Sequence, residues 1–447
     1  MAQDVIAIFD IGKTNKKILL FNHQLKRIFQ EEHKVEEISD EDGFACDDIE
    51  KIENWIMATI HQLTQNKEYN LRAVNFATYG ASLVYLDSDG RRLSPVYNYL
   101  KPMPEDVLPG FYERYGGAEE FSRNTASPVL GMLNSGMQIL WLKKHKPGVF
   151  SKVHAILHFP QYLSYLISKE IRSEYTSIGC HTAMWDFDHN CYHPWLADEG
   201  IALPFPVSNE ETTEIKMNGR NFLAGTGIHD SSSSLVPYLK GSPEPFILIS
   251  TGTWCIFMNP FNDEPLTIDQ LKQDALCYFS TNQKQVKSSR FFMGHFHDIY
   301  VGQIAAFFNK KTDSYKQVHA DESILNKLQE KPLFFIHSES VGNGCPAVDL
   351  SVFSSFEEAY HKLIMDLTVT GMKSLQLVIP EQDITKVVYV TGGFARNDIF
   401  MRLLAVLSGK TVYASEIDNA TALGAAMVVW DKVGLSGLDR LSGLNLK

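Results

Sequence analysis

Two stretches of this chain share one pattern: Val5-Ile6-Ala7-Ile8-Phe9-Asp10-Ile11-Gly12-Lys13-Thr14 and Phe246-Ile247-Leu248-Ile249-Ser250-Thr251-Gly252-Thr253. In each, an apolar run ends in a short glycine turn and a second apolar run follows, at 18–21 and at 255–258. Apolar runs joined by tight turns are typical of buried strands. The sequence therefore predicts two β-hairpins, one in each half of the chain.

Glycine turns of this kind suit a phosphate group. Glycine lets the backbone approach an anion and expose its N–H groups, and threonine hydroxyls add further donors. A carboxylate such as Asp10 can hold a metal ion beside the phosphates. One such hairpin is equally well explained as an ordinary turn without a ligand. The duplication favours two phosphate-binding hairpins that face one nucleotide.

The segment Gly12-Lys13-Thr14 also matches the end of the P-loop signature, but we reject that interpretation. The glycine that the motif requires five residues before Gly12 is replaced by Ala7, which lies inside a predicted strand. A further strand, and not a helix, is predicted after the turn.

Length and composition indicate a two-domain globular protein. A chain of 447 residues exceeds what one hydrophobic core usually supports. We expect one domain over 1–243 and another over 244–447, joined by a hinge because no low-complexity linker separates them. The 44% apolar and 21% charged residues are typical of a globular enzyme. A net charge of −12 argues against nucleic acid or an anionic membrane as the partner.

The cysteines and the N-terminus favour a cytoplasmic protein. Six scattered cysteines form no Cys-x-x-Cys pair, which is typical of reduced thiols. The N-terminus lacks the basic segment of a secretory signal, and the apolar run at 246–258 is too short to span a bilayer.

Periodicity predicts the remaining elements of both halves. Helices are expected at 47–63, 135–144, 160–167, 296–308, 356–378 and 420–429, and strands at 73–77 and 83–86. The proline- and aromatic-rich stretch 93–124 either lines a small-molecule pocket or forms a packed loop. A strand at 387–391 runs through Gly392 and Gly393 into a helix, where free N–H groups can hold an anion or a ribose. Small residues at 422–426 permit close helix packing.

Asp230 is the candidate general base. It follows Gly225-Thr226-Gly227-Ile228-His229 and precedes four serines, as expected at the entrance of a tightly packed helix. A carboxylate that faces the γ-phosphate can accept the proton of an attacking hydroxyl. The alternatives are that Asp230 only caps the helix and that His229 is an ordinary buried histidine instead of a group that orients a substrate hydroxyl.

Taken in order, these motifs resemble those of the FGGY family of carbohydrate kinases over nearly the whole chain. The resemblance rests on Asp10-Ile11-Gly12 with Thr14, on Gly227-x-x-Asp230 and on Ser250-Thr251-Gly252-Thr253. It is completed by the adenosine motif Gly392-Gly393-x-x-x-Asn397 and by residues 421–426 in the closing helix.

The resemblance implies an α/β fold of two ribonuclease-H-like, actin-like ATPase domains that close on ATP and Mg²⁺. It implies Asp230 as the base and Asp10 as the Mg²⁺ ligand, directly or through water. The nucleotide would be bound by Gly12, Lys13, Thr14, Asn15, Thr251, Gly252, Thr253, Gly392, Gly393 and Asn397. Sugar would be bound mainly by the N-terminal domain, and a homodimer is left open.

The segments around Tyr79-Gly80 and Tyr97-Asn98-Tyr99 are similar to the rhamnulokinase branch and its fuculokinase relatives. This similarity favours an L-6-deoxyketohexose phosphorylated at O1, with Gly80, Tyr99, His229 and Asp230 at the sugar; a pentulose is the alternative substrate. The branch usually has Asp and Arg after its second Tyr, where this chain has Leu100-Lys101. Another group would then supply that sugar contact.

Three further interpretations remain open. The hairpins and the adenosine turn also occur in chaperone-like nucleotide switches, and a degenerate kinase could act as a regulator. Extra lysines in the first turn either help to hold ATP or form a solvated hairpin tip, which is favoured for Lys16 and Lys17 individually. The cluster of His295, His297 and Asp298 could bind a metal ion, but we disfavour this because a helix is expected there.

Overall fold

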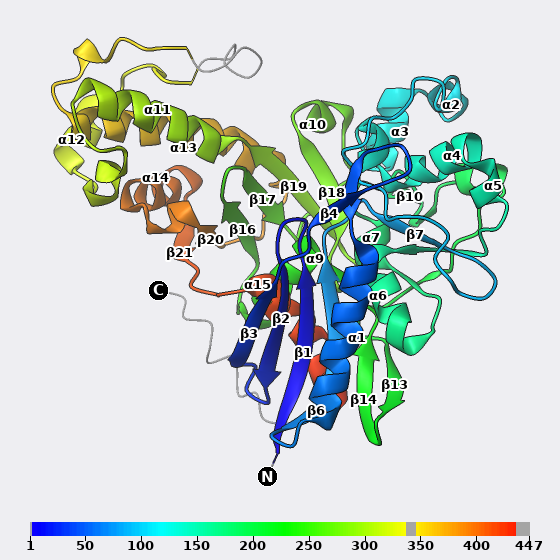
Figure 1. Ribbon diagram of the computed structural model, residues 1–447. Coiled ribbons are helices and arrows are strands. Elements are labelled where there is room, and N and C mark those ends of the chain that lie inside the picture. Colours follow the sequence, from blue (N-terminus) through cyan, green and yellow to red (C-terminus); the bar gives the residue numbers. More distant parts are fainter. Residues whose placement is uncertain (1, 337–345, 435–447) are drawn as a thin grey trace.

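Two mixed β-sheets with the same strand arrangement form the centres of the two halves of the chain (Figure 1). The structure is a computed structural model that describes residues 2–336 and 346–434. The N-terminal sheet has the order β13-β14-β6-β1-β2-β3, and β15 also pairs with β6. These strands are β1 (Gln3–Ile11), β2 (Lys16–Asn22), β3 (Arg27–His33), β6 (Tyr69–Thr78), β13 (Thr212–Met217), β14 (Arg220–Gly225) and β15 (Ile228–His229).

The C-terminal sheet repeats this topology. Its order is β18-β19-β17-β16-β20-β21. In each sheet the hairpin strand that begins the motif, β1 or β16, is antiparallel to its partner on one side and parallel to a later strand on the other. The predicted pair of ribonuclease-H-like α/β domains is confirmed. The strands are β16 (Phe246–Thr251), β17 (Cys255–Asn259), β18 (Ala275–Phe279), β19 (Gln285–Phe291), β20 (Val387–Gly392) and β21 (Thr411–Ala414).

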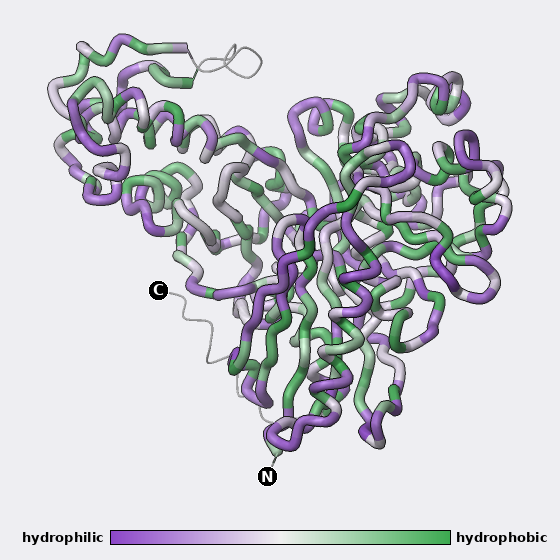
Figure 2. The backbone as a smooth tube through the Cα atoms, in the orientation of Figure 1, coloured by the Kyte–Doolittle hydropathy of each residue, from purple (hydrophilic) through white to green (hydrophobic). Residues whose placement is uncertain are grey.

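Side-chain alternation along β1 assigns its two faces to different helices. Val5, Ala7 and Phe9 pack with α1 (Ile49–Gln65) and α6 (Phe159–Ser168), whereas Ile6 and Ile8 belong to the cluster that contains α15 (Ala420–Trp430). Because side chains of a strand alternate between its faces, Asp10 is directed to the α15 side. Figure 2 shows the contrast between these apolar central strands and the largely hydrophilic edge strand β3.

Helix α9 (Asp230–Gly241) lies between the two sheets. Its Val236 joins the cluster of α15 and the N-terminal sheet, while Leu235 and Tyr238 pack against Phe246 and Tyr389 of the C-terminal sheet. α15 comes from the C-terminal half of the sequence but packs on β1, β6 and α9. The predicted boundary at 243/244 therefore separates α15 in sequence from the sheet that it covers.

Small residues allow α9 and α15 to approach closely, as the sequence predicts. A Cβ atom on Gly424 would lie 1.9 Å from the carbonyl oxygen of Ser233, so only glycine fits there. The Ser233 hydroxyl donates to the carbonyl of Thr421, and that of Ser232 donates to Phe279 in the C-terminal sheet.

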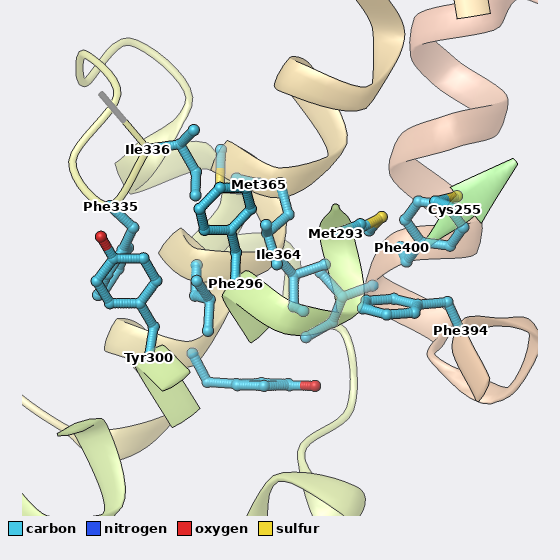
Figure 3. Packing of buried hydrophobic residues seen from close by; sticks show 14 of the residues in the cluster. Cys255, Met293, Phe296, Tyr300, Phe335, Ile336, Ile364, Met365, Phe394 and Phe400 are labelled. Atoms are coloured by element: carbon cyan, nitrogen blue, oxygen red, sulfur yellow. The ribbon is translucent and has the colours of Figure 1, made fainter. Parts of the chain in front are cut away.

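The other face of the C-terminal sheet is covered by α11 (Met293–Phe307) and α13 (Phe356–Leu377). Figure 3 shows Phe296, Tyr300 and Phe335 at one side of this core, and Cys255, Met293, Phe394 and Phe400 at the other. The second group connects the hairpin strand β17 to the turn after β20. The core therefore fixes these two turns relative to each other.

The remaining elements surround the sheets. Residues 83–203 of the N-terminal half contribute a separate hydrophobic cluster at the upper right of Figure 1. There Phe111, Tyr112 and Tyr115 pack on Phe121, which confirms the packed-loop interpretation for these three aromatic residues. The short strands are β4 (Glu37–Ser39), β5 (Ala45–Asp47), β7 (Leu83–Leu86), β8 (Ala155–His158), β9 (Ser173–Glu174), β10 (Trp185–Asp186), β11 (Cys191–Tyr192) and β12 (Pro206–Val207).

The predicted long helices are present, with ends that differ by a few residues. Within residues 2–336 and 346–434, no helix is long and apolar enough to cross a membrane. Five cysteines are free thiols, and Cys345 lies outside the described residues. The helices not yet given are α2 (Phe111–Arg114), α3 (Ala118–Asn124), η1 (Gly131–Leu133), α4 (Ser135–His145), α5 (Pro147–Phe150), α7 (Tyr175–Ile178), α8 (Trp195–Asp198), α10 (Ile268–Lys272), η2 (Thr312–Gln317), α12 (Glu322–Leu328), η3 (Leu350–Val352), η4 (Gly393–Arg396), α14 (Asp398–Ser408) and η5 (Asp431–Val433).

Candidate active site

Three strands of the N-terminal sheet end side by side and bring two carboxylates together. In the sheet register Asp10 of β1 is level with Ala77 of β6, and Ala77 is level with Ile228 of β15. Asp230 follows two residues after Ile228. Burial, and then the negative charge of Asp230, raise the pKa of Asp10 to about 6, against an opposing effect of Lys17. The two acids are therefore close enough to interact.

Asp230 is not the cap of α9. The N-cap is His229, whose Nδ1 accepts a hydrogen bond of 3.2 Å from the backbone N–H of Ser231. Asp230 is the first helical residue, its Oδ1 accepts from the same N–H at 2.6 Å, and its side chain is 37% exposed. Because histidine does the capping, a partly exposed carboxylate remains available to accept a proton.

Gly80 and His229 are in direct contact, as the predicted sugar site requires. A Cβ atom on residue 80 would lie 2.4 Å from Nε2 of His229, so a larger residue would displace the imidazole. His229 is buried, with 5% of its surface exposed. Since Nδ1 is an acceptor, Nε2 carries the ring proton and is directed toward Gly80.

Tyr99 lies at the same edge of the sheet. Its ring is 6.1 Å from that of Tyr79, which precedes Gly80. Burial raises the pKa of Tyr99, Lys13 opposes this rise, and the charge of Asp230 adds to it. The predicted sugar residues Gly80, Tyr99, His229 and Asp230 are therefore brought together.

Lys101 does not take the place of the polar residues missing after Tyr99. Its ammonium lies 2.6 Å from Asp40 and 2.7 Å from Asp42, and 4.9 Å from the ring centre of Trp141. The residue is 7% exposed. Lys101 therefore belongs to a buried ion cluster and not to the predicted sugar site.

The first hairpin turn is closed by a hydrogen bond from the N–H of Gly12 to the carbonyl of Asn15. Thr14 and Asn15 are exposed at the tip and are free to contact a phosphate. Lys13 pairs with Glu37 and with Asp47, so its predicted phosphate contact stays a prediction.

The prediction that Lys16 lies at a solvated hairpin tip is wrong. Lys16 is 1% exposed, and its Nζ lies 2.8 Å from Oδ1 of Asp47. A buried ammonium requires such a partner. Asp47 was predicted to begin the helix at 47–63, but Asp48 is the N-cap of α1 and Asp47 is free to bind the lysines. Lys17 is partly exposed and lies 3.4 Å from Glu32.

The second hairpin and the adenosine turn are joined through Thr251. Its hydroxyl donates to the carbonyl of Thr391 and accepts from the N–H of Phe394 at 3.1 Å. Gly392 has a φ of +87°, and a Cβ atom there would lie 1.8 Å from the carbonyl oxygen of Thr251. Thr251 is 5% exposed, so it positions the turn, whereas Gly252 and Thr253 are exposed.

These two turns form one wall of a pocket of about 510 Å³ in the C-terminal half. Four predicted nucleotide residues besides Thr251 line it: Gly252, Thr253, Gly393 and Asn397. Sequence analysis did not assign the polar residues opposite them, because the segments 297–319 and 396–398 meet only in the folded chain. These are His297, Asp298, Tyr315, Lys316, His319, Arg396 and Asp398.

The side chain of Asn397 is occupied by contacts within the protein. Its Oδ1 accepts from the N–H of Phe400 at the start of α14, and its Nδ2 donates to the hydroxyl of Tyr360 at 2.8 Å. The same hydroxyl lies 3.2 Å from Nε2 of His297. Asn397 therefore lines the pocket while it holds α13 and α14 together.

The arrangement fits a divalent cation at the acids of the first hairpin. Mg²⁺ prefers oxygen ligands and is usually held by one or two carboxylates together with substrate phosphates. Asp10 and Asp230 supply such oxygens beside the hairpin turn. No group of three or more His, Cys, Asp or Glu side chains in the described ranges could hold a metal by itself, the His295–Asp298 cluster included. This segment lies in α11, as expected.

Comparison with known families gives matches in both halves of the chain. Residues 5–200 match the family described as "FGGY family of carbohydrate kinases, N-terminal domain". Residues 243–436 match "Carbohydrate kinase FGGY, C-terminal domain". The two matches cover both sheets, both hairpins and α15.

Curated relatives and solved structures agree with these matches. Rhamnulokinase from Halalkalibacterium halodurans is 23% identical, over 95% of this chain and 93% of the relative. Rhamnulokinase from Oceanobacillus iheyensis is 22% identical, over 94% and 91%. Among solved structures, a carbohydrate kinase from Novosphingobium aromaticivorans has a TM-score of 0.79 at 21% identity, over 96% of this chain and 91% of that one. A ligand-bound xylulose kinase from Lactobacillus acidophilus has a TM-score of 0.76 at 17% identity, over 99% and 92%.

Proposed function

Because the chain belongs to the FGGY family of carbohydrate kinases, we propose that it transfers the γ-phosphoryl group of ATP to the primary hydroxyl O1 of a ketose. The proposed substrate is an L-6-deoxyketohexose such as L-rhamnulose or L-fuculose. The similarity to curated rhamnulokinases over almost the full length supports this choice. The likeness to xylulose kinases concerns the fold.

The observation that carries the proposal is the meeting of Asp10 and Asp230 at the edge of the N-terminal sheet. One acid lies at the end of the first hairpin strand. The other lies at the start of the helix between the domains and is partly exposed. A metal ligand and a general base are needed at such a distance in phosphoryl transfer to a hydroxyl.

The proposed roles follow from these positions. Asp230 accepts the proton of the attacking sugar hydroxyl, while Gly80, Tyr99 and His229 surround the sugar. Asp10 holds Mg²⁺, which when bound neutralises charge on the phosphates. Backbone N–H groups and hydroxyls of the two turns bind the phosphates, and the pocket beyond Gly393 takes the adenosine. The nucleotide residues are Gly12, Thr14, Asn15, Gly252, Thr253, Gly392, Gly393 and Asn397.

A nucleotide switch without sugar chemistry is the alternative from another class. It would need the two hairpins and the adenosine turn but no base at a sugar site. The contact of Gly80 with His229, next to a partly exposed Asp230, favours the kinase.

The test is ADP release from Mg-ATP across a panel of ketoses: L-rhamnulose, L-fuculose, and the L and D forms of ribulose and xylulose. Glycerol, aldoses and no sugar are the controls. We expect strong stimulation by an L-6-deoxyketohexose. Stimulation by a pentulose alone would replace the proposed substrate, and slow release that does not depend on sugar would favour the switch.

A further inference from the structure

The ion pair of Lys13 and Glu37 lies beside the aromatic side of the proposed sugar site. Nζ of Lys13 is 2.8 Å from Oε1 of Glu37 and 6.0 Å from the ring centre of Tyr79. The side chain of Lys13 is 22% exposed and that of Glu37 is 45% exposed. The pair therefore presents donors and an acceptor to solvent at the edge where Tyr79, Gly80 and Tyr99 meet.

Asp47 fixes the position of this ion pair. Its Oδ2 accepts both from Nζ of Lys13 at 3.0 Å and from the hydroxyl of Tyr79 at 2.6 Å, and its Oδ1 accepts from Lys16. Asp47 is 3% exposed, so three hydrogen bonds to one buried carboxylate hold the first hairpin turn against Tyr79. These bonds also lower the pKa of Asp47 against the effect of burial.

The ammonium of Lys13 acts on the sugar side of the hairpin. It opposes the rise in the pKa of Tyr99, whose hydroxyl is also influenced by Asp230. The phenol is therefore within electrostatic range of both Lys13 and the proposed base. The nearest lysine after Tyr99 in the sequence, Lys101, is held away by Asp40 and Asp42.

An ammonium beside a carboxylate is suited to a pair of neighbouring hydroxyls. The ammonium donates to one hydroxyl oxygen, and the carboxylate accepts from the other hydroxyl. We propose that Lys13 and Glu37, positioned by Asp47, bind two hydroxyls of the ketose beyond the reacting carbon and so help to select the sugar. This assignment rests on the proposed function, and it makes the lysine of the first turn a sugar residue instead of a phosphate residue.

Steady-state kinetics of Lys13→Met and Glu37→Gln with the preferred ketose test the assignment. We expect the KM for the ketose to rise about 10- to 100-fold in Lys13→Met, the range for loss of a charged hydrogen bond. The kcat and the KM for Mg-ATP should remain near wild type, because binding shared by ground and transition states is lost. Lys13→Arg should restore part of the ketose affinity, since it keeps the cation.

Two comparisons make the result specific. L-rhamnulose and L-fuculose differ in configuration at C4, and their kcat/KM ratio should move toward one in Lys13→Met and in Glu37→Gln. The matched control is Lys51→Met, because Lys51 is an exposed lysine that pairs with Asp48 only a few residues from Asp47. Its kinetics should equal those of the wild type.

Other outcomes would overturn the assignment. A higher KM for Mg-ATP with an unchanged KM for the ketose would make Lys13 a phosphate residue. Wild-type kinetics in both variants would remove the pair from recognition altogether. If the wild-type protein turns over no ketose, the proposed function itself fails, and ketose recognition by Lys13 and Glu37 fails with it.

Discussion

At the scale of single residues, the contrast between His229 and Asp230 explains how a helix terminus can carry chemistry. The imidazole caps α9, which leaves the carboxylate partly exposed in front of the helix. A negative charge at this position is stabilised by the helix N-terminus. The carboxylate therefore remains ionised and ready to accept a proton near neutral pH.

We expect Asp230→Asn to lower kcat by about 10²- to 10⁴-fold, the usual contribution of a general base. ATP binding should change little, because the amide is nearly isosteric with the carboxylate. Rapid-quench or coupled assays measure the first effect, and titration calorimetry measures the second. Asp269→Asn, in the first turn of the surface helix α10, is the control and should behave as wild type. Normal turnover in Asp230→Asn would contradict the proposed mechanism.

Asp10 makes Mg-ATP binding sensitive to pH. Its pKa of about 6 lies above the usual value because of burial and the charge of Asp230, so the carboxyl becomes neutral as the pH falls through about 6. A neutral carboxyl is a poor metal ligand. Affinity for Mg-ATP should therefore be retained above this pH and decline below it, as measured by calorimetry from pH 5 to 8.

Asp230→Asn provides the internal comparison for this pH profile. It removes one cause of the raised pKa, so Asp10 should stay ionised to lower pH and the decline in affinity should shift downward. The terminal phosphate of ATP titrates in a similar range, and the comparison cancels that contribution. Identical profiles in both proteins would show that Asp10 does not control the decline.

At the scale of elements, the packing of α9 against α15 depends on a single missing side chain. The carbonyl of Ser233 occupies the place of a Cβ atom at Gly424. We expect Gly424→Ala to reduce the free energy of unfolding by about 1–3 kcal/mol, as overpacking usually does. Denaturant melts measure this change.

Gly302→Ala is the matched control for that substitution. Gly302 lies within α11, and no heavy atom lies within 4 Å of the position that its Cβ would take. Because alanine favours a helix, this variant should be more stable by roughly 0.5–1 kcal/mol. Equal effects at the two sites would mean that close packing of α9 on α15 is not what Gly424 provides.

At the scale of the whole molecule, the N-terminal sheet is completed by a helix from the other end of the chain. Ala422, Ala425 and Val429 of α15 cover the face of β1 that carries Ile6 and Ile8. We expect residues 1–243 expressed alone to bind a hydrophobic dye and to lack near-ultraviolet circular dichroism, because this apolar face is uncovered.

The same fragment with residues 419–434 fused to it is the control, and it should regain native-like dichroism. A fragment 1–243 that folds without α15 would show that the N-terminal sheet needs no cover from the C-terminal half. Either result measures how strongly the two halves depend on each other.

The sequence alone determined the two hairpins, the fold class, the candidate base and the order of most helices. These depend on local patterns: apolar alternation, glycine turns and small residues at fixed spacing. The solvated tip expected for Lys16 was wrong because its partner, Asp47, lies on another element. A local pattern does not contain the ion pairs that tertiary folding creates.

Only the tertiary structure decided which polar groups share a site. It placed Asp10 beside Asp230, and it showed that Thr251 and Asn397 spend their hydrogen bonds within the protein. It also withdrew Lys101 into a buried cluster and brought Lys13 and Glu37 to the edge near Tyr79. Burial and charge pairing depend on segments that are distant in sequence, and these segments meet only when both sheets have formed.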